Sequence, residues 1–106
     1  MPLYMWRMRL TPQGARGLLE AGGTSRRQAA EITVRGLGGR LEAFYYALGG
    51  DDLFAIAELP DTSTAAAVAL QVAAGGAAHI ETVRLLTAAE MDGIARIPVD
   101  YRPSGT

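Results

Sequence analysis

The chain lacks two residue types on which many enzymes depend. Its 106 residues include no cysteine, which excludes disulfide bonds, thiolate metal sites and a cysteine nucleophile. Lysine is also absent, and all 10 basic residues are arginines. Neither Schiff-base chemistry on a lysine nor a phosphate-binding loop with its lysine can therefore occur in this chain.

Excess charge and long apolar runs are missing as well. The net charge of −1 gives no general attraction to nucleic acid or to an anionic membrane, so we expect neither as a partner. No apolar run approaches the ~20 residues of a membrane-spanning helix. Arg7 and Arg9 within the first ten residues do not fit a signal peptide. We expect a cytoplasmic protein with one globular domain.

Three segments that resemble β-strands are apolar or aromatic on both faces. They are Leu3–Leu10, Arg40–Leu48 and Leu53–Leu59. Successive side chains of a strand point to opposite faces, so a half-buried strand alternates apolar and polar residues. A chain of this length has too few helices to cover both sides of the sheet. We therefore expect a second copy to cover one side, in a homodimer or a higher homo-oligomer.

Capping residues and glycines predict the helices. A Thr-Pro pair is typical of a helix start, a polar cap followed three residues later by Glu or Gln is a capping box, and Gly-Gly pairs end helices. The third expected helix is rich in alanine, which suits close packing against a sheet. The helices are expected over residues 11–22, from Ser25 to about Leu37, over Thr64–Ala74, and from Thr87 to about Ile94.

The order of the elements predicts the fold. The turn Gly49-Gly50-Asp51-Asp52 joins two strands into a hairpin, and Ala78–Leu86 forms the fourth strand. The resulting order is strand, helix, strand, strand, helix, strand. It is typical of an α+β, ferredoxin-like βαββαβ domain, in which a four-stranded antiparallel sheet carries its helices on one face.

Several short motifs resemble the GYD domain family. The resemblance covers roughly residues 1–95, and residues 96–106 form a C-terminal tail. It implies a dimeric α/β-barrel of ferredoxin-like domains. The family's Gly-Tyr-Asp signature is incomplete here, because Asp51 stands at the tyrosine position. The motifs are Met1-Pro2-Leu3-Tyr4, Thr11-Pro12, Gly49-Gly50-Asp51-Asp52, Glu58-Leu59-Pro60-Asp61, the alanine-rich helix and Leu85-Leu86-Thr87-Ala88-Ala89-Glu90.

Two residues are candidates for catalysis. His79, the single histidine, lies at the start of the fourth strand, where an imidazole can act as a general base or an iron ligand. The alternative is an exposed polar residue at a strand end. Glu58, if it were buried, would be able to move protons. Its alternative is an arginine–glutamate pair at an interface between copies.

A set of aromatic and apolar residues is the candidate substrate site. If these side chains face away from the helices, they form the wall of a pocket for an apolar molecule with one polar handle. A slip of one residue in the strand pairing would exchange Tyr45 and Tyr46 between the two faces. The candidate residues are Arg7, Phe44, Tyr46, Phe54 and Ile56.

Two further features have simpler interpretations. Removal of Met1 would leave Pro2 as a secondary amine of the kind that serves as a base in tautomerases, but a proline also fits an extended segment here. Two adjacent carboxylates, Asp51 and Asp52, supply too few oxygens for a calcium or magnesium site and fit a turn better. We expect no metal site and no cofactor.

The sequence supports two main functional hypotheses. The first is a small homo-oligomeric α/β-barrel protein that binds or acts on a small apolar metabolite. Isomerisation, ring closure and oxygenation are the reactions suggested by family analogy. The second is a non-catalytic oligomerisation or scaffold protein. An RNA-binding sheet is rejected, because the strand Leu53–Leu59 lacks the basic residue and the aromatic spacing of that class.

Overall fold

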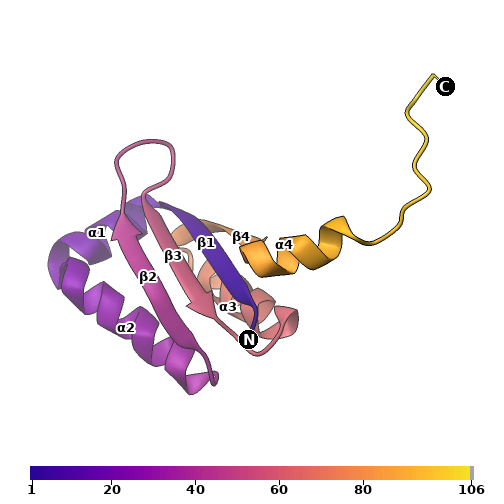
Figure 1. Ribbon diagram of the computed structural model, residues 1–106. Helices are drawn as coiled ribbons and strands as arrows, with labels where there is room; N and C mark the ends of the chain where they lie inside the picture. Colours follow the sequence, from indigo (N-terminus) through magenta and orange to yellow (C-terminus); the bar gives the residue numbers. More distant parts are fainter. Residues whose placement is uncertain (106) are drawn as a thin grey trace.

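The computed structural model describes residues 1–105 and shows one antiparallel sheet of four strands (Figure 1). The strands lie in the order β2-β3-β1-β4, and every neighbouring pair is antiparallel. The α+β class and the antiparallel sheet expected from the sequence are confirmed. The strands are β1 (Leu3–Leu10), β2 (Arg40–Tyr46), β3 (Leu53–Glu58) and β4 (Ala78–Leu85).

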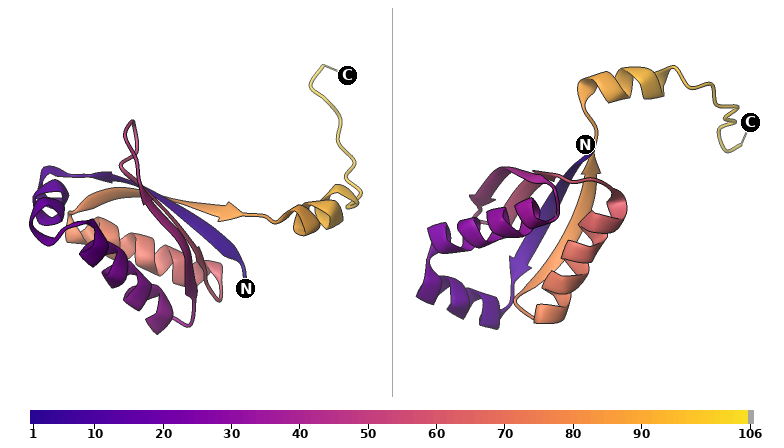
Figure 2. Two further views of the ribbon diagram at one scale, coloured as in Figure 1. Left: turned by 60° about the vertical axis from the view of Figure 1, so that its left-hand side comes forward. Right: turned by 90° about the horizontal axis from the view of Figure 1, so that it is seen from below.

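Three helices cover one face of the sheet, and the fourth lies apart from it. Figure 2 shows α1, α2 and α3 together on one side, while the other side carries no helix. The fourth helix follows β4 and continues away from the domain (Figure 1). The helices are α1 (Pro12–Ala21), α2 (Gly23–Gly36), α3 (Thr62–Gly75) and α4 (Ala88–Ala95).

Side-chain caps start three of the four helices. Thr11 accepts a hydrogen bond from the Gly14 N–H, and the Asp61 carboxylate accepts one from the Thr64 N–H at 2.8 Å. The capping box at α4 is confirmed, with reciprocal bonds between Thr87 and Glu90. Caps of this kind satisfy N–H groups that have no partner within the helix.

The capping box predicted at Ser25 is wrong. Helix α2 begins at Gly23, and its N-cap is Gly22, which makes no side-chain capping bond. Gly22 has φ +84°, a left-handed value that glycine adopts without steric cost. This conformation turns the chain directly from α1 into α2, so the second helix starts before the polar residues that predicted its beginning.

The hairpin loop is longer than the tight turn expected from its glycines. β2 ends at Tyr46 and β3 begins at Leu53, so the loop spans residues 47–52. Asp52 ties this loop to β1. Its N–H donates to the Met8 carbonyl, and its Oδ2 accepts from the Leu10 N–H, both at 2.8 Å. Asp52 therefore anchors the loop to the end of a neighbouring strand, where a two-residue turn would not reach.

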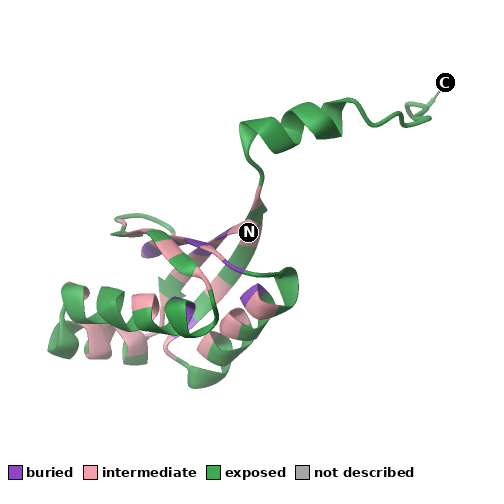
Figure 3. Ribbon diagram, turned by 60° about the horizontal axis from the view of Figure 1, so that its bottom comes forward, coloured by how far each residue is buried: buried purple, intermediate pink, exposed green. Residues whose placement is uncertain are grey.

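The core lies between the sheet and its three covering helices. Tyr4 and Trp6 on β1 are each only 2% exposed, and small alanines on β3 and α3 let the helix pack closely. The Tyr4 hydroxyl lies 2.9 Å from Thr62 Oγ1, which links β1 to the start of α3. Buried residues are confined to these layers, and α4 is exposed along its whole length (Figure 3).

Two glycines in α1 offer a matched test of this packing. A Cβ at Gly14 would lie 1.9 Å from the Ala77 carbonyl oxygen, whereas a Cβ at Gly17 would meet no atom within 4 Å. We expect Gly14→Ala to destabilise the fold by about 1–3 kcal/mol. Gly17→Ala should stabilise it by up to about 1 kcal/mol, because alanine favours the helix. Urea unfolding measures both, and equal effects of the two substitutions would contradict the close contact at Gly14.

Candidate functional site

The strand pairing defines which residues lie on the uncovered side of the sheet. Met5 pairs with Ile56 and Val83, and its neighbour Trp6 points into the core. Because side chains alternate along a strand, Met5 and its partners share the side without helices, which we call the open face. The open face comprises Leu3, Met5, Arg7, Arg9, Arg40, Ala43, Tyr45, Phe54, Ile56, Glu58, His79, Glu81, Val83 and Leu85.

The expected grouping of four aromatic and apolar residues needs correction. Phe54 and Ile56 lie on the open face, but Phe44 pairs with Ala55 and Tyr46 with Leu53, on the helix side. The residue opposite Phe54 is Tyr45, which is 71% exposed. Phe44 pairs with the residue next to Phe54, and neighbouring residues of a strand point to opposite faces, so the two rings lie on opposite faces. The register of the hairpin decides this placement, and neither strand determines it alone.

A β-bulge between Leu41 and Ala43 reverses which residues of β2 point to which face of the sheet. Beyond the bulge Leu41 turns into the core, while Arg40 lies opposite Glu58 on the open face. Arg40 Nη2 lies 3.4 Å from a Glu58 carboxylate oxygen and also contacts Glu42. The candidate proton carrier Glu58 is therefore paired with an arginine of its own chain.

Arg7 forms the second charged cluster of the open face. Its Nη2 lies 3.2 Å from Asp51 Oδ2, and its Nη1 lies 3.8 Å from Glu81. The Asp51 side chain reaches from the hairpin loop to β1. The Arg7 guanidinium, which was expected to belong to the substrate site, is thus engaged with two carboxylates.

The two catalytic candidates lie far apart in one chain. His79 pairs with Arg9 at one end of β1, and Glu58 pairs with Leu3 at the other end. At ~3.3 Å per residue, these positions are about 20 Å apart along β1. Both side chains belong to the open face, and His79 is exposed. A single chain does not bring them into one catalytic site.

A cavity of about 230 Å³ lies between the sheet and the helices. Phe44 and Tyr46 line it, with ring centroids 5.4 Å apart in an edge-to-face arrangement. Trp6 and Met8 of β1 also contribute to its wall. Small residues on the facing helices, Gly14, Ala29 and Ala30, leave this space unfilled. The cavity was not predicted from the sequence, although these small residues are the feature of the sequence that indicates it.

One charged residue lines the cavity, Arg26 in the first turn of α2. Within residues 1–105 its guanidinium forms no ion pair, whereas the adjacent Arg27 pairs with Glu31 at 3.1 Å. The Tyr46 hydroxyl donates to the Gly23 carbonyl at 3.0 Å. Partial burial raises the pKa of Tyr46, and the positive charge of Arg26 opposes that rise.

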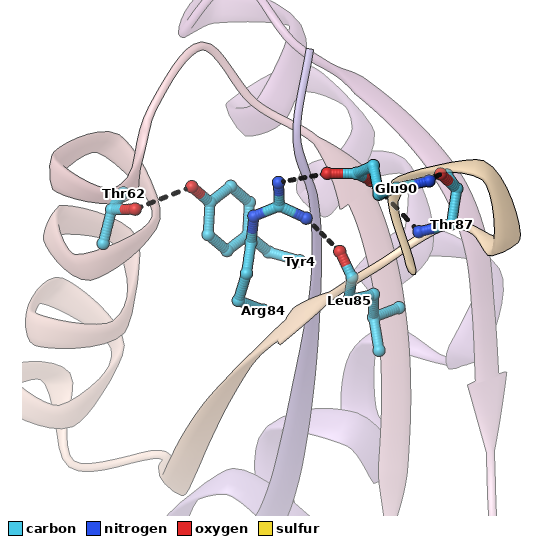
Figure 4. A network of polar contacts seen from close by, with 6 residues as sticks. All are labelled: Tyr4, Thr62, Arg84, Leu85, Thr87 and Glu90. Carbon is cyan, nitrogen blue, oxygen red and sulfur yellow. Dashed lines mark hydrogen bonds and ion pairs between the residues drawn. The ribbon is translucent and has the colours of Figure 1, made fainter. Parts of the chain in front are cut away.

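A separate polar network holds α4 to the end of β4 (Figure 4). The Arg84 guanidinium lies 5.7 Å from the centre of the Tyr4 ring, and its Nη2 lies 2.9 Å from a Glu90 oxygen. It also contacts the Leu85 carbonyl. The hydrogen bond from the Thr87 N–H lowers the pKa of Glu90, and the bond from Arg84 adds to this effect. This network fixes the direction in which the chain leaves the sheet.

The Tyr46–Arg26 pair predicts a pH dependence. A folded-state pKa above the unfolded value means that Tyr46 contributes stability below about pH 10, and this contribution is lost as the pH rises through the folded pKa. Arg26→Gln should raise the pKa of Tyr46 further, because it removes the cation that favours the phenolate. Absorbance titration at alkaline pH, with Tyr46→Phe to assign the transition, measures the shift. Arg27→Gln is the control, and an equal shift in that variant would contradict a specific effect of Arg26.

Within residues 1–105 no helix has both the length and the apolar character needed to cross a membrane, and no group of three or more histidine, aspartate or glutamate side chains is placed to hold a metal ion.

Comparison with known proteins gives a family. No curated protein and no solved structure matches the chain. The model of the GYD domain matches residues 4–95. This match spans the sheet and all four helices, and the chain belongs to the GYD domain family.

Proposed function

We propose that this protein is a small homo-oligomeric α/β-barrel protein of the GYD type that binds a small apolar metabolite without a cofactor. The observation that carries the proposal is the cavity of about 230 Å³ beneath the sheet. Its wall is mostly aliphatic and aromatic, with few polar groups, as is usual for sites that bind small molecules. Pockets for drug-sized ligands have volumes of roughly 300–1,000 Å³, so the ligand here is smaller.

The position of the catalytic candidates favours binding over catalysis in the cavity. His79 and Glu58 lie on the open face, so the sheet separates them from the cavity. Glu58 is also paired with Arg40. These observations support the second candidate function, a non-catalytic oligomeric protein, for the open face itself. Catalysis by His79 or Glu58 would require groups from another copy.

Apolar residues across the centre of the open face support self-association. Met5, Ile56 and Val83 form a row across three strands, and each remains partly exposed in the single chain. The Arg7 and Arg40 clusters flank this row on either side along the strands. Packing two such faces together would bury the apolar row and leave the ion pairs at the rim, the arrangement typical of stable interfaces. Such interfaces bury roughly 800 Å² on each partner.

The C-terminal arm, residues 86–105, gives a second reason to expect a partner copy. Every residue of the arm is exposed, and α4 lies away from the covering helices (Figure 2). A helix as short as α4 is unstable in water without packing. A second copy of the chain would supply a surface for this packing. The large exposed apolar residues of the arm are Leu86, Met91, Ile94, Ile97, Val99 and Tyr101.

The ligand-binding proposal is tested with 1-octanol as a neutral apolar probe. Trp6 is the single tryptophan and lines the cavity, so its fluorescence reports on occupancy. We expect a saturable fluorescence change in the unmodified protein and its loss in Ala30→Phe, which fills the cavity. Ala67→Phe, on an exposed part of α3, is the matched control and should retain binding. Absence of saturable binding to the unmodified protein would refute the proposed ligand function.

The oligomer proposal is tested on the open face. Ile56→Arg places a charge in the apolar row, and a buried unpaired charge is costly. We expect light scattering to find a dimer or a larger assembly for the unmodified protein and a monomer for this variant at micromolar concentration. Ile32→Arg, at a 64% exposed position on α2, should leave the assembly unchanged. A stable monomer of the unmodified protein would refute self-association.

A further inference from the structure

We propose that the ligand of the cavity is a small carboxylate with an apolar body, and that Arg26 binds its carboxylate group. The inference rests on the proposed function, because it assigns a ligand chemistry to the same cavity. The wall of the cavity contains one charged residue and is otherwise uncharged. Arg26 is the one charged residue among the described residues that line the cavity, and no carboxylate lines it.

The hydrogen-bond donors around the cavity point to a ligand that accepts hydrogen bonds. The Tyr46 hydroxyl donates to the Gly23 carbonyl, and the Thr33 hydroxyl donates to the Ala29 carbonyl at 3.0 Å. Their protons are therefore already used. Arg26 forms no ion pair within residues 1–105, and the buried Trp6 Nε1 has no hydrogen-bond partner there. The buried Trp6 Nε1 therefore requires an acceptor, and the exposed Arg26 guanidinium is free to bind one.

The electrostatics of this end of the cavity favour a negative charge. Arg26 lies in the first turn of α2, which contains no acidic residue. The partial positive charge of the helix start therefore adds to that of the guanidinium and is not balanced locally. Burial raises the pKa of Tyr46, and the charge of Arg26 lowers it in part, as expected for a cation beside this residue of the cavity wall. A single cation matches a single anionic group.

The shape of the guanidinium and the character of the wall narrow the ligand class. A guanidinium binds a carboxylate through two parallel N–H···O bonds, which gives direction as well as affinity. The rest of the ligand faces Phe44, Val68 and similar side chains, where further charged or polar groups would lose their hydration without gaining partners. This excludes sugars and multiply charged phosphates in favour of an apolar monocarboxylate.

The test compares octanoate with 1-octanol, two probes with the same apolar body. Binding is followed by Trp6 fluorescence and by calorimetry at pH 8, where octanoate is ionised. We expect octanoate to bind about tenfold more tightly than 1-octanol, the size of effect given by one exposed charge-assisted hydrogen-bonded pair. Arg26→Gln should weaken octanoate about tenfold and 1-octanol less than twofold. Arg26→Lys keeps the charge and should restore part of the affinity.

The adjacent Arg27 supplies the matched control, because it pairs with Glu31 and does not line the cavity. Arg27→Gln should leave both affinities unchanged. If the unmodified protein binds both probes equally, or Arg26→Gln retains full affinity for octanoate, the carboxylate assignment is overturned while the cavity remains a ligand site. If neither probe binds the unmodified protein, the proposed function fails and the assignment fails with it.

Discussion

The backbone pairing between β2 and β3 determines what each face of the sheet can do. Tyr45 lies opposite Phe54, so Phe44 and Tyr46 turn inward and become walls of the cavity. The hairpin loop that sets this pairing is held by two hydrogen bonds between Asp52 and the end of β1. A shift of one residue would move two aromatic rings out of the cavity and onto the open face. The proposed ligand site and the proposed self-association surface therefore depend on the same register.

The same register determines where the charged residues of the open face lie. Arg7 and Arg40 each contact two carboxylates, and these clusters lie on either side of the apolar row. Asp51 takes part in one cluster from the hairpin loop. Exposed ion pairs of this kind contribute little to stability, typically about 0–1 kcal/mol. They place the polar groups of the open face beside the apolar centre rather than within it.

The sequence predicted those features that are encoded locally. Strand positions followed from runs of bulky apolar and aromatic residues, and the caps at Thr11 and Thr87 followed from residue type and spacing. The start of α2 was mispredicted, because the chain turns at Gly22, whose φ is positive, and the helix begins before the polar residues at which it was expected. The faces of Phe44 and Tyr46 depend on pairing between two strands, which neither strand encodes alone.

The cavity could not be predicted from the sequence for a similar reason. It arises where small residues of two helices face aromatic rings of the sheet, and no single segment contains that combination. Arg26 directly precedes Arg27, which has a carboxylate one turn away, and the sequence alone does not distinguish the two arginines. Only the packing of α2 against the sheet separates the roles of these two arginines.

The exposed C-terminal arm has a consequence for the behaviour of the protein in dilute solution. A single capping box and one ion pair hold α4, and an unsupported helix of two turns melts readily. In the proposed assembly, the order of this helix is coupled to protein concentration. Dilution would then lower the helical content and expose the segment after Leu86 to proteases, while the four-stranded domain stays folded. The concentration of the protein would in this way set how much of the chain is structured.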